Sequence, residues 1–134
     1  MERVETLKKR LKNINDSEEI MSIIIEIIRD GEYIPEIGNY YTFIYNAKTI
    51  RDRSKEKVTP PIDKIYFDQH PLIQVLSISK WGFTGYNFHW SGIGNEIHNY
   101  TWNEISSRLY QIRSEEINYF KTINYMKMER YKTF

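Results

Sequence analysis

The chain of 134 residues contains no cysteine. This absence excludes disulfides, thiolate-ligated zinc, iron–sulfur centres and cysteine nucleophiles. An excess of charge of one sign is also missing, because 19 Lys and Arg stand against 18 Asp and Glu, for a formal net charge of +1. Bulk charge therefore does not drive binding to nucleic acid or to a membrane, although local patches are compatible with this balance.

Long apolar runs are lacking as well. The longest, Ile20–Ile28, contains Ser22 and Glu26 and is far shorter than a membrane span. The highly charged start, Met1 to Lys12, does not have the pattern of a signal peptide. We therefore expect no membrane association and no secretion through a signal peptide.

Good helix formers are scarce: there is a single alanine, Ala47, and there are five leucines against twenty-one isoleucines and eleven tyrosines. Isoleucine and tyrosine favour strands. The length is that of one domain, and 40% hydrophobic residues suffice for a core. We predict one α+β domain, residues 1–134.

A helical pair is predicted over residues 1–37. Val4, Leu7 and Leu11 recur at helical spacing in the first helix. Asp16 precedes the second as an N-cap, with Glu19 three residues later. Residues 1–13 carry five basic and two acidic groups, whereas residues 14–38 carry one basic and seven acidic groups.

An antiparallel β core is predicted over residues 38–90. The β-branched and aromatic stretches 40–45 and 72–78 and the alternating stretch 83–90 read as strands, the last two joined by the turn at 80–82. Phe83, Asn87 and His89 should share one face of the last strand. These strands should form a small curved antiparallel sheet or an SH3-like barrel.

The end of the chain is predicted to return to helix. Thr101 with Glu104 has the pattern of a capping box, and apolar residues recur at helical spacing, which predicts a helix over 101–118. Residues 119–134 form a basic-aromatic tail. The expected fold is thus a sheet or barrel flanked by two N-terminal helices and one C-terminal helix.

Motifs that would indicate a reaction are absent from the sequence. No HExxH or HxH spacing and no Gly-x-Ser-x-Gly elbow occurs. A metal enzyme would need His89, His98, Asp68 or Glu96 to converge. We expect no catalytic residues, no metal and no cofactor, and we interpret Asp68, Asn87 and His89 as polar residues that stabilise the β core.

Two surfaces are candidates for binding. A basic loop could grip the phosphates of a nucleic acid; its residues are Lys48, Arg51, Arg53, Lys55 and Lys57. The apolar second helix and the aromatic tail could instead contact protein subunits, through Ile24, Ile28, Tyr125, Tyr131 and Phe134.

Three segments of the β core resemble a family of small proteins encoded by large tailed bacteriophages. They are residues 38–48 (GNYYTFIYNAK), 66–73 (YFDQHPLI) and 85–90 (GYNFHW), and the charged loop at 49–64 departs from the family pattern in its length. The resemblance spans residues 38–90. It implies a phage origin and a structural or DNA-handling role, and it supplies no catalytic residues.

Together these observations predict a non-enzymatic bacteriophage structural or assembly protein of the virion that acts through protein–protein contacts. Its partners would be other phage proteins or a second copy of the chain, and its location would be the virion or the cytoplasm of the host cell. The alternative is a small nucleic-acid-binding accessory protein that uses the loop 48–57.

Overall fold

The computed structural model describes residues 2–47, 58–59, 64–92 and 96–132. Helices α1 (Glu2–Arg10) and α2 (Ser17–Ile28) come first, and short helices follow the sheet strands: the 3-10 helices η2 (Phe88–Trp90) and η3 (Trp102–Glu104) and the α-helical turn α3 (Ile117–Phe120). The described strands are β1 (Gly31–Glu32), β2 (Tyr40–Thr42), β3 (Val58–Thr59), β4 (Lys64–Asp68), β5 (Leu72–Ile78), β6 (Gly82–Asn87), β7 (Ile97–Thr101), β8 (Leu109–Ile112) and β9 (Met128–Lys132).

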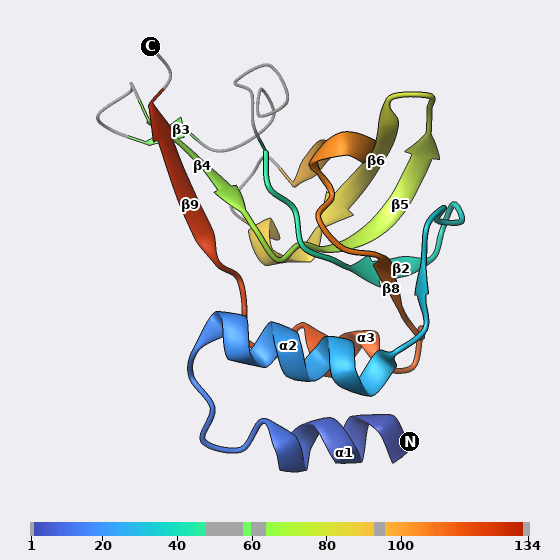
Figure 1. The fold of residues 1–134 in the computed structure, drawn as a ribbon, viewed down its shortest axis with the longest axis vertical. Coiled ribbons are helices and arrows are strands. Elements are labelled where there is room, and N and C mark those ends of the chain that lie inside the picture. Colours follow the sequence, from blue (N-terminus) through green and yellow to red (C-terminus); the bar gives the residue numbers. More distant parts are fainter. Residues whose placement is uncertain (1, 48–57, 60–63, 93–95, 133–134) are drawn as a thin grey trace.

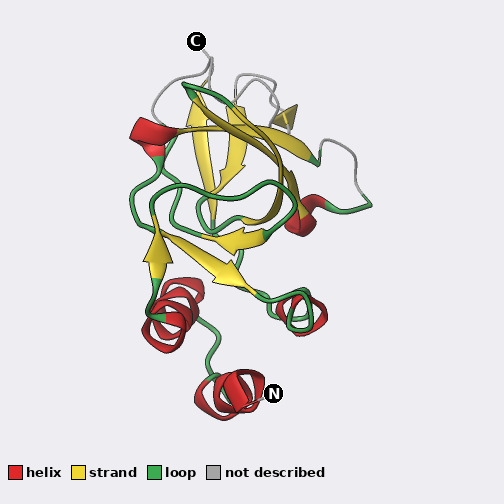
Figure 2. Cartoon of the chain, turned by 90° about the vertical axis from the view of Figure 1, so that its right-hand side faces the viewer, coloured by secondary structure: helices red, strands yellow, loops and turns green. Residues whose placement is uncertain are grey.

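Two antiparallel sheets carry the β core. Among the described residues, six strands form one sheet in the order β1-β8-β2-β5-β6-β7, and three form the other in the order β3-β4-β9. The sheet curves above the helices, and α2 lies between α1 and the sheet (Figures 1 and 2). The predicted α+β fold with a small curved antiparallel sheet is therefore confirmed. The barrel alternative is not, because no pairing joins the described edge strands β1 and β7.

The large sheet is covered on both faces. On the face toward the helices, Leu72 and Ile112 pack with Leu7, Met21, Ile24 and Phe120. On the opposite face, aromatic side chains form a second core; they are Tyr41, Phe43, Tyr45, Phe67, Phe83 and Tyr100. Consecutive residues of a strand point to opposite faces, so Leu72 enters one core and Ile73 the other.

The second helix begins as predicted. The Asp16 carboxylate accepts the backbone N–H of Glu19 at 3.0 Å, which satisfies one free donor of the first turn. The third predicted strand is confirmed up to Asn87, and Phe83, Gly85 and Asn87 are its buried positions. A β-carbon at Gly82 would lie 1.8 Å from the Tyr100 carbonyl oxygen, so only glycine permits this approach of β6 to β7.

The helix predicted over 101–118 is wrong. The Thr101 hydroxyl donates to the Glu104 side chain rather than capping a helix. The backbone groups of Glu104 and Ser106 bond to Asn46 and Ile44, so they are not available for helical hydrogen bonds. Leu109 and Ile112, three residues apart, point into opposite cores from β8, a pattern that resembles helical periodicity only in the sequence.

The predicted basic-aromatic tail 119–134 is in part built into the fold. It contains α3 residue Phe120 and strand β9, which pairs with β4 in the small sheet. None of the helices in the described part of the chain is long and apolar enough to cross a membrane.

Candidate functional site

The structure brings together Asp68, Asn87 and His89, the three polar residues assigned to the β core. Asp68 Oδ2 lies 2.5 Å from His89 Nδ1 and 3.4 Å from Asn87 Nδ2. Asp68 is 3% exposed and Asn87 is 1% exposed. A buried carboxylate needs such partners, because an unpaired charge in the interior is costly.

Local backbone geometry holds these three side chains. Asp68 is the last residue of β4, and its Oδ1 accepts the backbone N–H of His70 at 2.9 Å, which forms an Asx-type turn before Pro71 and β5. Asn87 is the last residue of β6, and its Oδ1 caps η2 by accepting the N–H of His89 at 2.8 Å. Asp68 thereby fixes the turn before β5, and Asn87 fixes the start of η2. The same two side chains also contact each other.

A second set of bonds connects this cluster to the helical layer. His70 Nδ1 donates to the Tyr125 carbonyl oxygen at 3.0 Å. The Tyr125 hydroxyl donates to Thr42, whose own hydroxyl donates to the Pro71 carbonyl oxygen. Burial lowers the pKa of His70 and raises that of Tyr125, so both side chains are neutral at pH 7.

We call the cluster of Asp68, Asn87 and His89 a structural joint, because its contacts connect separate elements of the fold. The His89 ring lies edge to face with Tyr125, at 5.0 Å between centroids. His89 Nε2 is buried and has no hydrogen-bond partner within the described residues. An aspartate–histidine pair could orient a general base, but Nε2 is shielded from solvent, so substrate would not reach it in this conformation.

The metal-enzyme alternative gains the contact between Asp68 and His89. Asp68 and His89 meet, whereas the His98 ring stacks with Trp90 and Tyr100, and the Glu96 backbone oxygen accepts the N–H of Asn87. In the part of the chain that the structure describes, no three His, Asp or Glu side chains form a group able to hold a metal ion.

The predicted protein-interface residues require a correction. Ile24, Ile28 and Tyr125 lie in the core between the helices and the sheet and are at most 6% exposed. Both α1 and the sheet cover α2. This is why α2 carries more apolar residues than a helix that buries only one face. Tyr131 of β9 pairs with Ile65 of β4 through the backbone. The side chain of Tyr131 and all of Phe134 lie outside the described residues.

The basic loop is the second binding surface that the sequence predicts. Its residues Lys48, Arg51, Arg53, Lys55 and Lys57 all lie outside the described residues. Binding of nucleic acid through this loop therefore stays a prediction, tested by salt-dependent binding of the Arg51→Ala/Arg53→Ala/Lys55→Ala variant.

An exposed apolar segment between β1 and β2 was not anticipated. Tyr33, Ile34 and Ile37 are 73%, 71% and 64% exposed, the highest values among the large apolar side chains of the described residues. We call these three side chains the 33–37 surface. The run YIPEI between Gly31 and Gly38 is the sequence signal, since three large apolar residues in a short connection are unusual.

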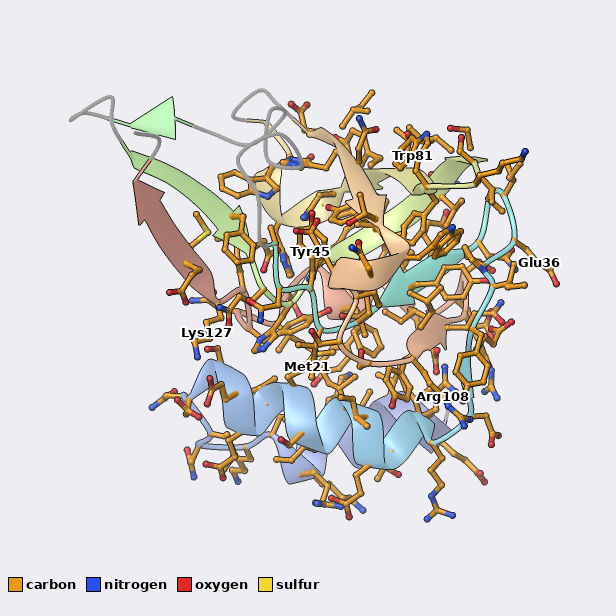
Figure 3. All side chains as sticks on the ribbon, turned by 45° about the horizontal axis from the view of Figure 1, so that its top comes forward. Met21, Glu36, Tyr45, Trp81, Arg108 and Lys127 are labelled. Carbon is orange, nitrogen blue, oxygen red and sulfur yellow. The ribbon has the colours of Figure 1, made fainter. Side chains whose placement is uncertain are left out.

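This segment is held at both ends. The N–H of Glu36 donates to the Tyr41 hydroxyl at 2.9 Å, and the N–H of Gly38 donates to the Val75 carbonyl oxygen at 2.8 Å. Arg108 donates to the Tyr33 hydroxyl at 2.8 Å and stacks on the same ring. The exposed apolar side chains are thus presented on an ordered backbone; Figure 3 shows Glu36 and Arg108 on the same side of the molecule.

A cleft of about 520 Å³ adjoins the 33–37 surface. Its lining is Glu32, Tyr33, Trp102, Ile105, Ser106, Ser107, Arg108 and Leu109. Tyr33 belongs to both features, so an apolar surface and a partly apolar cleft are contiguous.

Comparisons with protein-family models, with curated proteins and with solved structures give no match for the chain.

Proposed function

We propose that the chain is a non-enzymatic assembly component of a tailed-bacteriophage virion, and that it binds a neighbouring virion protein through the 33–37 surface. The observation that carries this proposal is the exposure of Tyr33, Ile34 and Ile37 on an ordered segment. Contiguous exposed apolar side chains are typical of protein-binding sites.

The fixed backbone of this segment is a second observation that supports binding, beside the exposure of its apolar side chains. Fixing a loop costs conformational entropy, and a loop already fixed does not incur that cost again when a partner arrives. Here the hydrogen bonds to Tyr41, Val75 and Arg108 hold the loop before binding. A side chain such as Ile34 can therefore contribute most of its burial energy to association.

The phage part of the proposal rests on the resemblance of residues 38–90. Asp68, Asn87 and His89, which belong to the resembling segments, form the buried joint rather than a site open to substrate. This use of the shared residues supports an architectural role for the family pattern. Partners would be other phage proteins or further copies of the chain.

The test is to purify particles of the phage that encodes the chain and to quantify the chain by mass spectrometry. The native chain should be found in the particles, and the Ile34→Ser/Ile37→Ser variant should be depleted about tenfold or more, the effect of losing binding-site anchors. Ile97→Ser is the matched control, because Ile97 is also exposed, at 48%, but lies on the edge strand β7.

The control variant should enter particles as the native chain does. Particles that lack the native chain would overturn the proposal. Equal incorporation of the double variant, with circular dichroism showing that it is folded, would reject the 33–37 surface as the contact.

A further inference from the structure

The cleft beside the 33–37 surface has a mixed chemistry that restricts its occupant. Trp102, Ile105 and Leu109 provide apolar walls, and Ser106 and Ser107 provide hydroxyls. Glu32 is the carboxylate in the lining. A side chain that fills such a cleft has an apolar stem and a polar or cationic end.

Glu32 and Glu36 are two carboxylates that repel each other at this edge of the sheet. Among the described residues, neither Glu32 nor Glu36 forms an ion pair with Lys or Arg. Burial, and then repulsion by Glu36, raises the pKa of Glu32. Both carboxylates also act on Tyr41, whose pKa is raised chiefly by burial. A cation supplied by a partner would stabilise the ionised form of Glu32, which burial and repulsion by Glu36 disfavour.

The cation in the lining of this cleft, Arg108, does not pair with Glu32, and Arg3, which lines a neighbouring cleft with Glu32, pairs with Glu116. Arg108 lines the cleft, but its guanidinium lies 4.6 Å from the Tyr33 ring centroid and donates to the Tyr33 hydroxyl. Its role is to hold Tyr33 in place as one wall of the cleft. Glu32 is left to face the occupant.

We infer that the cleft and the 33–37 surface together recognise a segment of another protein in which lysine or arginine alternates with apolar side chains. The aliphatic stem of the basic residue lies along Trp102 and Ile105, its charge meets Glu32, and apolar neighbours cover Ile34 and Ile37. The inference rests on the proposed function, since it states the chemistry of the partner that binds this surface.

NMR titration of the full chain with two synthetic peptides tests this. One peptide alternates leucine with lysine, and the other alternates leucine with glutamate. The lysine peptide should shift the backbone amides of residues 32–34, 36–37 and 105–109. Its Kd should rise about fivefold or more between 50 and 500 mM salt, because salt screens exposed charge pairs. The glutamate peptide should leave these amides unchanged.

Charge-neutralising variants sharpen the test. Glu32→Gln and Glu36→Gln keep the shape of the side chain and should each weaken the lysine peptide severalfold. Glu115→Gln is the matched control, because Glu115 is an exposed acid outside the cleft lining. Equal binding of both peptides, no binding of the lysine peptide, or an unchanged Kd in Glu32→Gln would overturn the inference.

Two outcomes separate this inference from the proposed function. Normal incorporation of Glu32→Gln/Glu36→Gln into particles would reject the basic partner while the assembly role stands. A dimer in sedimentation experiments that Ile34→Ser abolishes would assign the surface to a second copy and would also overturn the basic segment. Absence of the native chain from particles would reject the assembly role whatever the peptides show.

Discussion

The Asp68–His89 pair, with Oδ2 and Nδ1 2.5 Å apart, joins the two sheets of the molecule. Asp68 ends β4 of the small sheet, and His89 lies in η2 directly after β6 of the large sheet. Through His70 and Tyr125 the same cluster reaches the segment that follows α3. One carboxylate thus connects three parts of the fold that are remote in sequence.

Replacing Asp68 with alanine should lower the free energy of unfolding by about 3–5 kcal/mol, the usual effect of removing one member of a buried pair. The change removes the acceptor of His89 Nδ1 and of the His70 N–H, whereas Asn87 Nδ2 keeps its hydrogen bond to the Tyr100 hydroxyl. Urea unfolding at pH 7 measures the loss. Glu115→Ala, at an exposed position, should change the value by no more than about 0.5 kcal/mol. Equal effects of the two substitutions would show that Asp68 is not a joint.

His70 should make stability depend on pH. Its pKa is lowered chiefly by burial, so the folded chain binds its proton more weakly than the unfolded chain, whose histidine pKa is about 6.5. The contribution of His70 to stability is complete above that pKa and is lost as the pH falls through the folded pKa, by at most about 1.4 kcal/mol per pH unit.

The matched variant for this effect is His70→Asn, whose amide can still donate to the Tyr125 carbonyl oxygen. Between pH 7.5 and 5.5 the native chain should lose more stability than this variant, as measured by urea unfolding. Parallel curves for the two chains would assign the acid sensitivity to other groups.

Local signals were sufficient for the elements that depend on local chemistry. The Asp16 cap places the start of α2, and the alternation along Phe83, Gly85 and Asn87 identifies the buried face of β6. The polar residues Asp68 and His89 were recognisable because they interrupt aromatic strand-forming stretches, where a polar side chain needs a partner.

Other features depend on pairings that the sequence does not encode locally. Leu109 and Ile112 have helical spacing, and only the pairing of β8 with β1 and β2 makes that segment a strand. Ile24 and Ile28 suggested an interface because nothing in the sequence shows that both α1 and the sheet cover α2. The 33–37 surface escaped notice for the opposite reason: its apolar residues look like core until the fold exposes them.

The Arg3–Glu116 pair should be a major fastening of α1. Arg3 Nε donates to Glu116 Oε2 at 2.8 Å, and Glu116, 1% exposed, also accepts the N–H of Arg113. Arg3→Ala should lower the free energy of unfolding by about 3 kcal/mol, since it leaves a buried carboxylate without its cation. Arg3→Lys should recover only part, because lysine lacks the planar fork.

The control for Arg3 is Lys8→Ala on the same helix. Lys8 pairs with Glu5 at 3.6 Å on an exposed face, and such pairs contribute at most about 1 kcal/mol. A loss in Arg3→Ala no larger than in Lys8→Ala, by thermal or urea unfolding, would contradict the fastening role.

The ionised carboxylate of Glu32, which we propose binds a basic partner, should lower the stability of the free chain at neutral pH. Because its pKa is raised in the folded state by burial and by Glu36, the ionised carboxylate is less favourable in the folded chain than in the unfolded chain. Its protonated form contributes stability below the unfolded pKa, and that contribution is lost as the pH rises through the folded pKa. Glu32→Gln, which is neutral at every pH, should therefore unfold at a higher temperature than the native chain at pH 7.5. The difference should vanish below about pH 4, where the native carboxyl is itself protonated.

Calorimetry at the two pH values measures this difference in unfolding temperature, with Glu115→Gln as the exposed control. A variant that is less stable than the native chain at pH 7.5 would mean that Glu32 has a favourable partner in the free protein, and the need for a cation from outside would disappear.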